Sequence, residues 1–193
     1  MGLHDTKKLG ARIVRYADDF VVLCKGKVGA PLARIRYILD RLDLTLNESK
    51  THVVDARQDS FNFLGFEIRV SKGRKSGKRY AHVCPSPKSL AKIKERMKQL
   101  TTRNRTPIPL EDIVGSMNAS LRGWTNYFHY KNSSSVLSKV RTYAEERLRT
   151  HLMKRHKVKD RGIALGRFPS QQLYQRYGLY KVPTTAGWRS VHA

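Results

Sequence analysis

Residues 12–24, RIVRYADDFVVLC, decide how the N-terminal part of the chain folds. Two short apolar runs, 13–16 and 20–23, flank the polar segment Ala17-Asp18-Asp19. Two strand-forming runs around so short a polar segment are typical of a β-hairpin with a tight turn. The stretch therefore predicts two antiparallel strands with two carboxylates at their tip.

The segment that follows predicts one helix and more strands. Pro31 suits a first helical turn, and apolar residues recur after it at a helical spacing, at Leu32, Ile35, Leu39 and Leu42. Short strands are predicted at 44–46 and 51–54. The segment FNFLGF at 61–66 precedes a predicted strand at 67–70, and a return strand is predicted at 79–84 after the basic turn KGRKSGK of residues 72–78. These elements predict a partial antiparallel sheet with one helix.

The pattern becomes helical after Pro85-Ser86-Pro87, where Ser86 suits an N-cap and Pro87 a first turn. Three amphipathic stripes follow, at Leu90, Ile93, Met97 and Leu100, then at Ile113, Met117, Leu121, Trp124 and Phe128, then at Leu137, Val140, Ala144, Leu148 and Leu152. They predict a three-helix bundle. Glycines and prolines interrupt the basic segment after it, for which an irregular, loosely packed tail is expected. The alternative is a tail that packs back on the helices.

The expected fold class is therefore α+β, in three parts. Residues 1–84 form a partial sheet with one helix, residues 85–157 form the three-helix bundle, and residues 158–193 form the basic extension.

The charge of the chain predicts its class of partner. Its 193 residues contain 39 Lys and Arg against 15 Asp and Glu, which gives a formal net charge of +24. Such an excess repels itself unless a polyanion neutralises it, and nucleic acid is the partner that this charge favours. An anionic membrane surface and a ribosomal-type basic protein are the alternatives.

The cysteines and the apolar runs of the sequence restrict the cellular environment that we expect for the protein. The two cysteines, Cys24 and Cys84, provide neither a disulfide framework nor a zinc-binding CxxC pair. No apolar run is long enough to cross a membrane, and no signal-peptide core is present. The expectation is a protein that is not secreted and has no membrane partner.

The adjacent carboxylates of Asp18 and Asp19 are the sharpest chemical feature. Like charges this close disfavour each other's ionised form, and a divalent cation with hard oxygen ligands, such as Mg²⁺, relieves the repulsion. Polymerases use two such ions to activate the attacking hydroxyl and to stabilise the leaving group. The alternative is a solvated Asp-Asp turn.

Four segments in order resemble group II intron reverse transcriptases, also called maturases. The hairpin RYADDFVVL, residues 15–23, resembles their YADD active-site motif. The later segments are LTLNESKT at 44–51, FNFLGF at 61–66, and LRGWTNYF at 121–128, which resembles the G-W-x-x-Y-F signature of the maturase-specific X region. Gly178-Leu179-Tyr180, followed by Trp188, resembles the end of that region.

The resemblance implies roles for the matched positions in an RNA-directed DNA polymerase. Asp18 and Asp19 would be catalytic and would bind Mg²⁺. Phe63, Leu64 and Gly65 would form the primer grip, where glycine allows a close backbone approach. Tyr16, Asn47 and Lys50 would support the palm beside the active site.

The family also uses a helical thumb to hold template–primer duplex and intron RNA. Glu95 is the lone acid between Ser86 and Arg105, so intrahelical pairing does not account for the lysines of that helix. The predicted RNA-binding residues are Lys88, Lys92, Arg96, Arg122, Lys139, Arg147 and Tyr127. For a charge-rich helix the alternative is a solvated face, and for Tyr127 it is the bundle core.

The sequence also departs from the family. A third palm carboxylate and the fingers would lie upstream of the YADD hairpin, and they are missing here, so the isolated chain is expected to be inactive and to need an N-terminal reverse transcriptase half for its Mg²⁺ site. Three hypotheses stay open: part of a split or larger polymerase, a non-catalytic RNA-binding module that assists intron folding and splicing, or a truncated remnant. The expected location is the bacterial cytoplasm or an organelle.

Overall fold

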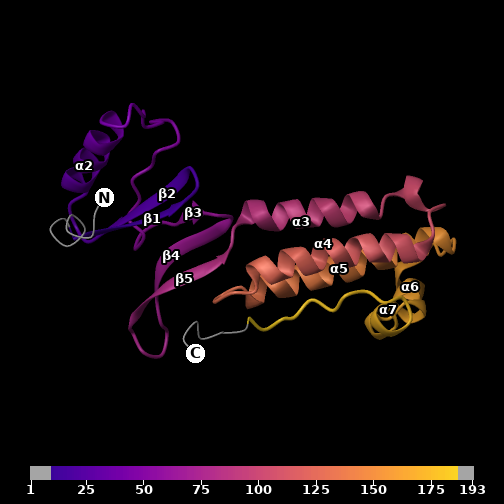
Figure 1. Cartoon of the computed structure of the whole chain (residues 1–193). Coiled ribbons are helices and arrows are strands. Elements are labelled where there is room, and N and C mark those ends of the chain that lie inside the picture. Colours follow the sequence, from indigo (N-terminus) through magenta and orange to yellow (C-terminus); the bar gives the residue numbers. More distant parts are fainter. Residues whose placement is uncertain (1–9, 187–193) are drawn as a thin grey trace, which may run out of the picture. The chain divides into compact units, whose positions relative to one another are not determined.

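A computed structural model describes residues 10–186 (Figure 1). They divide into two compact units, and the boundary in the sequence lies between Asp55 and Ala56. In the first unit, strands β1 (Ala11–Tyr16) and β2 (Asp19–Cys24) pair antiparallel from Ala11 opposite Cys24 to Tyr16 opposite Asp19. Helix α2 (Gly29–Asp40) follows, with Pro31 and Ile35 buried. The predicted hairpin and helix are confirmed.

The strands predicted at 44–46 and 51–54 are wrong, because residues 41–60 contain no strand. Asn47 organises this segment into turns instead. Its side-chain oxygen accepts a hydrogen bond from Lys50 N at 3.2 Å, and its carbonyl accepts one from Thr51 Oγ1 at 2.8 Å. Asparagine stabilises turns in this way, and local bonding here replaces pairing with another strand.

The second unit opens with a three-stranded antiparallel sheet of β3 (Phe61–Phe63), β4 (Phe66–Lys72) and β5 (Arg79–Pro85), in the order β3-β4-β5. A two-residue turn, Leu64-Gly65, joins β3 to β4, with φ values of 50° and 79°. Both residues lie in the left-handed region, as tight hairpin turns require. The strands predicted at 67–70 and 79–84 are confirmed, and β3 was not predicted.

Three long helices form the core of the second unit: α3 (Pro87–Leu100), α4 (Leu110–Phe128) and α5 (Ser134–Arg155). The Ser86 side chain accepts a hydrogen bond from Ser89 N at 3.2 Å, which confirms the predicted cap of α3. A short 3₁₀ turn, Arg103–Arg105, lies in the connector to α4. Helix α3 packs against both other helices, and the predicted apolar stripes meet in one core. The mixed helix and strand class is confirmed.

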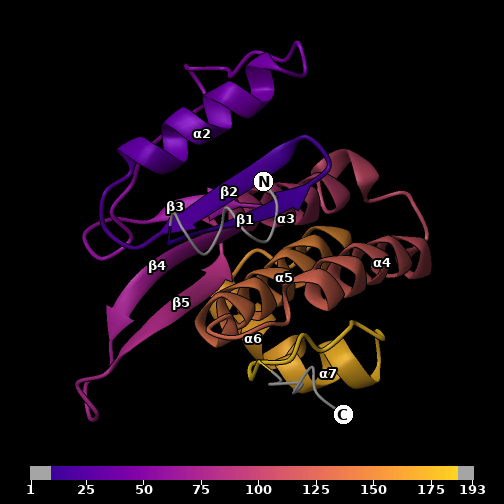
Figure 2. The same cartoon turned by 60° about the vertical axis from the view of Figure 1, so that its left-hand side comes forward.

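The loosely packed tail is a wrong prediction. Helices α6 (Arg161–Arg167) and α7 (Ser170–Gln175) pack against α5 (Figure 2), and Ala164, Leu173 and Val182 are fully buried. The glycines and prolines mark the ends of short helices, not a loose chain. Asp160 caps α6 by accepting a hydrogen bond from Ile163 N at 2.8 Å.

Candidate nucleic-acid interface

The two carboxylates lie at the tip of the first hairpin. Ala17 and Asp18 form the loop, with Ala17 at a φ of 50°, and Asp19 begins β2 opposite Tyr16. Asp18, Asp19 and Tyr16 are exposed, and Arg15 Nε donates a hydrogen bond to the Ala17 carbonyl at 2.8 Å. Within residues 10–186, no ion pair neutralises either carboxylate.

The hairpin alone does not provide a complete set of ligands for Mg²⁺. Mg²⁺ favours about six oxygen ligands in an octahedron. Between residues 10 and 186, no three His, Cys, Asp or Glu side chains are grouped so that they could hold a metal ion. Two neighbouring carboxylates therefore do not make a complete site. Asn47 and Lys50, the other predicted palm residues, lie in the turn segment after α2.

The Phe63-Leu64-Gly65 segment is fixed to the helices through its backbone. The Leu64 carbonyl accepts a hydrogen bond from Tyr127 Oη at 2.9 Å, and the Gly65 carbonyl accepts one from Ser89 Oγ at 2.8 Å. A Cβ atom on Gly65 would lie 3.0 Å from Ser89 Oγ and 3.2 Å from a ring carbon of Phe128. The close approach predicted for Gly65 is therefore made within the protein itself.

An exposed aromatic cluster adjoins this turn. Tyr127 is 54% exposed although its ring lies 5.6 Å from that of Phe66, and Tyr130 is 43% exposed and meets the same ring edge-on at 6.4 Å. Lys131 Nζ lies 5.5 Å from the centre of the Tyr130 ring. Tyr130, like Tyr127, is a possible base-stacking residue from the sequence, but Lys131 was missing from the predicted site. Its position next to Tyr130, just beyond a helix end, was the available signal.

Helix α3 carries an exposed cationic stripe, defined as Lys88, Lys92 and Arg96. These residues are spaced by four, so they recur on one side of the helix, away from the buried Ile93 and Met97. The helix has one acid, Glu95, which forms an ion pair with Lys98 at 3.8 Å. Within the described residues, no ion pair engages any member of the stripe.

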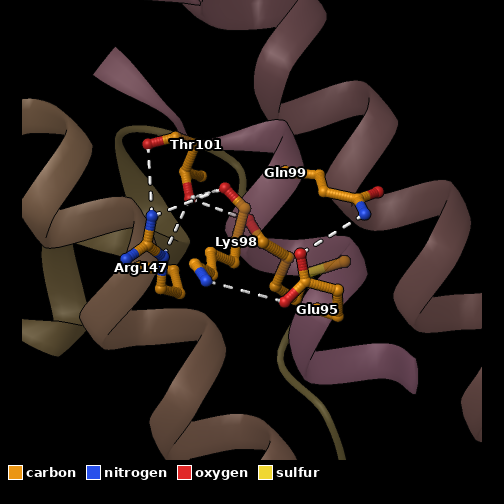
Figure 3. A network of polar contacts seen from close by, with 6 residues as sticks. Glu95, Lys98, Gln99, Thr101 and Arg147 are labelled. Atoms are coloured by element: carbon orange, nitrogen blue, oxygen red, sulfur yellow. Dashed lines mark hydrogen bonds and ion pairs between the residues drawn. The ribbon is translucent and has the colours of Figure 1, made fainter. Parts of the chain in front are cut away.

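Arg147 has a different environment from the stripe (Figure 3). Its Nε donates to Thr101 Oγ1 at 3.0 Å, and its Nη2 donates to the carbonyls of Lys98 at 3.5 Å and Thr101 at 3.3 Å. These groups form the C-terminal end of α3, where carbonyls lack helical partners. Arg147 therefore joins α5 to the end of α3.

The last two predicted residues lie on α4 and α5. The Arg122 guanidinium lies 4.5 Å from the centre of the Tyr180 ring. Lys139 is exposed and lies near Cys84. Burial, and then the charge of Glu67, raise the pKa of the Cys84 thiol, and Lys139 acts in the opposite direction. Trp188, part of the resemblance to the family, lies outside the described residues.

The comparison with protein families matches residues 90–168 to the group II intron, maturase-specific domain. A curated relative, described as an uncharacterized 91 kDa protein in cob intron of Schizosaccharomyces pombe, is 25% identical over 146 residues. That alignment covers 66% of this chain but only 18% of the relative's length. Residues 90–168, which run from α3 to α6, are thus similar to the maturase-specific domain of group II introns.

Between residues 10 and 186, no helix combines the length and the apolar composition that crossing a bilayer requires.

Proposed function

We propose that the chain binds group II intron RNA through the stripe on α3 and thereby assists the folding and splicing of the intron. The observation that carries this proposal is the exposure of Lys88, Lys92 and Arg96 without acidic partners in the described part of the chain. They lie on α3, most of which falls in the segment that matches the maturase-specific domain. Lysine and arginine that neutralise phosphates release counterions, and this release drives sequence-independent binding.

The charge around the stripe supports a nucleic-acid surface. Residues 86–186 contain 21 Lys and Arg but only 6 Asp and Glu. Lys139 on α5 is a further exposed cation that suits phosphate contact, and Tyr127 and Tyr130 offer exposed rings for unpaired bases. Arg147 is left out of the proposed surface because its donors already bind the end of α3.

The test replaces Lys88, Lys92 and Arg96 with alanine and measures binding of intron RNA over a range of salt concentrations. Each lost phosphate contact lowers the slope of log affinity against log salt by about one, so the slope should fall by about three. In-vitro splicing of the same RNA should weaken in parallel. Lys25, Lys27 and Arg41, which are exposed in the first unit, provide a control of equal charge.

Two outcomes would contradict the proposed RNA binding by the stripe. Equal weakening in the stripe variant and the control variant would mean that net charge alone attracts RNA. Binding that does not weaken as salt rises would exclude phosphate contact as its basis.

A second candidate function, as part of an RNA-directed DNA polymerase, is favoured by the exposed tip at Asp18 and Asp19. We propose that an N-terminal reverse transcriptase half, separate or continuous with this chain, would complete the Mg²⁺ site and hold the template–primer duplex with it. Location in the bacterial cytoplasm or an organelle stays a prediction.

Primer extension on an RNA template with Mg²⁺ tests this second candidate. The isolated chain should be inactive, because two carboxylates alone do not fix the geometry of a metal site. Extension by the isolated chain that disappears in the Asp18→Ala variant would overturn that expectation. Extension by the completed polymerase that survives Asp18→Ala would remove the candidate itself.

A further inference from the structure

The hairpin of β4 and β5 carries a second concentration of positive charge, which we name the basic arm and define as residues 69–82. Its tip points away from the helices in both views of the chain (Figures 1 and 2). Glu67 and Glu95 are the only acids between residues 60 and 95. The cations of the arm are Arg69, Lys72, Arg74, Lys75, Lys78 and Arg79.

The base of the arm is attached firmly to the bundle. Val83 exchanges two hydrogen bonds with Asn132, one to its carbonyl at 3.0 Å and one from its N–H at 3.2 Å. The Phe66 ring lies 5.0 Å from that of Phe128 on α4. The arm is therefore held in a defined direction relative to the helices of its own unit.

The far end of the arm has a regular backbone but exposed side chains. The strands stay paired out to Lys72 opposite Arg79, and the turn is closed by a hydrogen bond from Gly73 N to the Lys78 carbonyl at 2.9 Å. Residues 74–81 are all exposed. Tyr80, 43% exposed, lies beside His82 with ring centres 6.3 Å apart.

Without a ligand, the extended and highly charged arm lowers the stability of the folded protein. A two-stranded ribbon without a covering layer is marginally stable, and like charges gathered at its tip repel each other. A polyanion removes that repulsion. Cations on both strands of an exposed ribbon can reach phosphates, and contacts to phosphates do not depend on the nucleotide sequence.

We propose that the basic arm binds the phosphate backbone of structured RNA as a contact separate from the stripe on α3. The arm lies outside residues 90–168, which match the maturase-specific domain. The inference rests on the proposed function, because the ligand is the same RNA. With the arm and the stripe on successive elements, joined at Ser86, the chain holds RNA at two places.

The experiment replaces Arg74, Lys75 and Lys78 with alanine in the full chain and measures binding of intron RNA against salt. These side chains are exposed in a turn, so the far-UV circular dichroism should not change. The slope of log affinity against log salt should fall by about two to three. Combined with the stripe variant, the two losses in log affinity should add, as for distant sites.

The control is again the triple alanine variant at Lys25, Lys27 and Arg41. If the arm variant binds RNA like the unaltered chain while the stripe variant is weakened, the inference about the arm is overturned and the proposed function stands. If the unaltered chain itself fails to bind RNA, both the proposed function and the inference about the arm are contradicted. If the arm and control variants weaken equally, the arm is not a specific contact.

Discussion

Helices α3 and α5 are both rich in cations, but the stripe on α3 and the arginines of α5 have opposite environments. Lys88 and Lys92 on α3 are exposed and free of acidic partners in the described chain. On α5, Arg149 Nε donates to the Phe168 carbonyl at 3.0 Å, and Arg155 Nη1 donates to the carbonyls of Thr106 and Ile108 at 2.9 and 2.7 Å.

The contrast shows that the net charge overestimates the number of cations that are available to bind RNA. Arginine has five donors in a rigid planar fork and is more weakly hydrated than lysine, so it can satisfy carbonyls in partly buried places. Lysine keeps its strongly hydrated ammonium in water while its stem covers apolar surface. In this bundle, the arginines of α5 hold together the connector, the end of α3 and the C-terminal helices.

Among substitutions that distinguish the cations of α5 from those of α3, we expect the largest loss of stability at Arg147. Arg147→Ala should lower the free energy of unfolding by about 2–3 kcal/mol, because hydrogen bonds from a charged donor to partly buried oxygens are lost. Urea denaturation measures this change. Lysine at the same position keeps the charge but not the fork, so Arg147→Lys should recover only part of the loss.

The opposite result would break the comparison. If Arg147→Ala kept the stability of the unaltered chain but weakened RNA binding as much as a stripe substitution does, then Arg147 would belong to the RNA surface. The cations of α3 and α5 would then serve the same purpose.

Local patterns in the sequence were sufficient for much of the fold. The hairpin around Asp18, the cap at Ser86 and the three apolar stripes follow from turn chemistry, capping and periodicity, which act within a few residues. The strands predicted within 44–54 were wrong because short apolar runs do not reveal whether a partner strand exists. The prediction of a loose tail was wrong because the burial of Leu173 depends on a surface of α5 that is distant in the sequence.

The candidate site was predictable in composition but not in geometry. The sequence indicated which residues are cationic, acidic or aromatic, and it identified Lys88 and Lys92 because acids are scarce around them. It could not show that Arg147 binds the end of α3, since Thr101 is 46 residues away along the chain. Nor could it show that Tyr127 would be held by the turn at Leu64.

A smaller effect is expected from pH, through His151 on α5. This side chain is fully buried in the core. Burial lowers its pKa below the ordinary value, the polar backbone of Thr101 opposes this shift, and the nearby charges of Arg155, Lys154 and Arg147 lower the pKa further. The folded chain therefore keeps this imidazole neutral at pH values where the unfolded chain already binds a proton.

The sign of the effect follows from that difference. Above the unfolded-state pKa, about 6.5, His151 costs no stability. As the pH falls below this value, the unfolded chain takes up the proton first, and the free energy of unfolding declines until the folded chain is protonated as well.

Urea denaturation of the unaltered chain and of His151→Leu, repeated between pH 7.5 and 5, measures this contribution. The leucine variant has no imidazole to protonate, so its stability should decline less as the pH falls, whatever its level at pH 7.5. The other histidines and the carboxylates are common to both chains, so the difference between the two curves isolates His151. Parallel curves would mean that His151 is protonated as readily in the bundle as in the unfolded chain, and the cations around it would then impose no penalty on a further charge in α5.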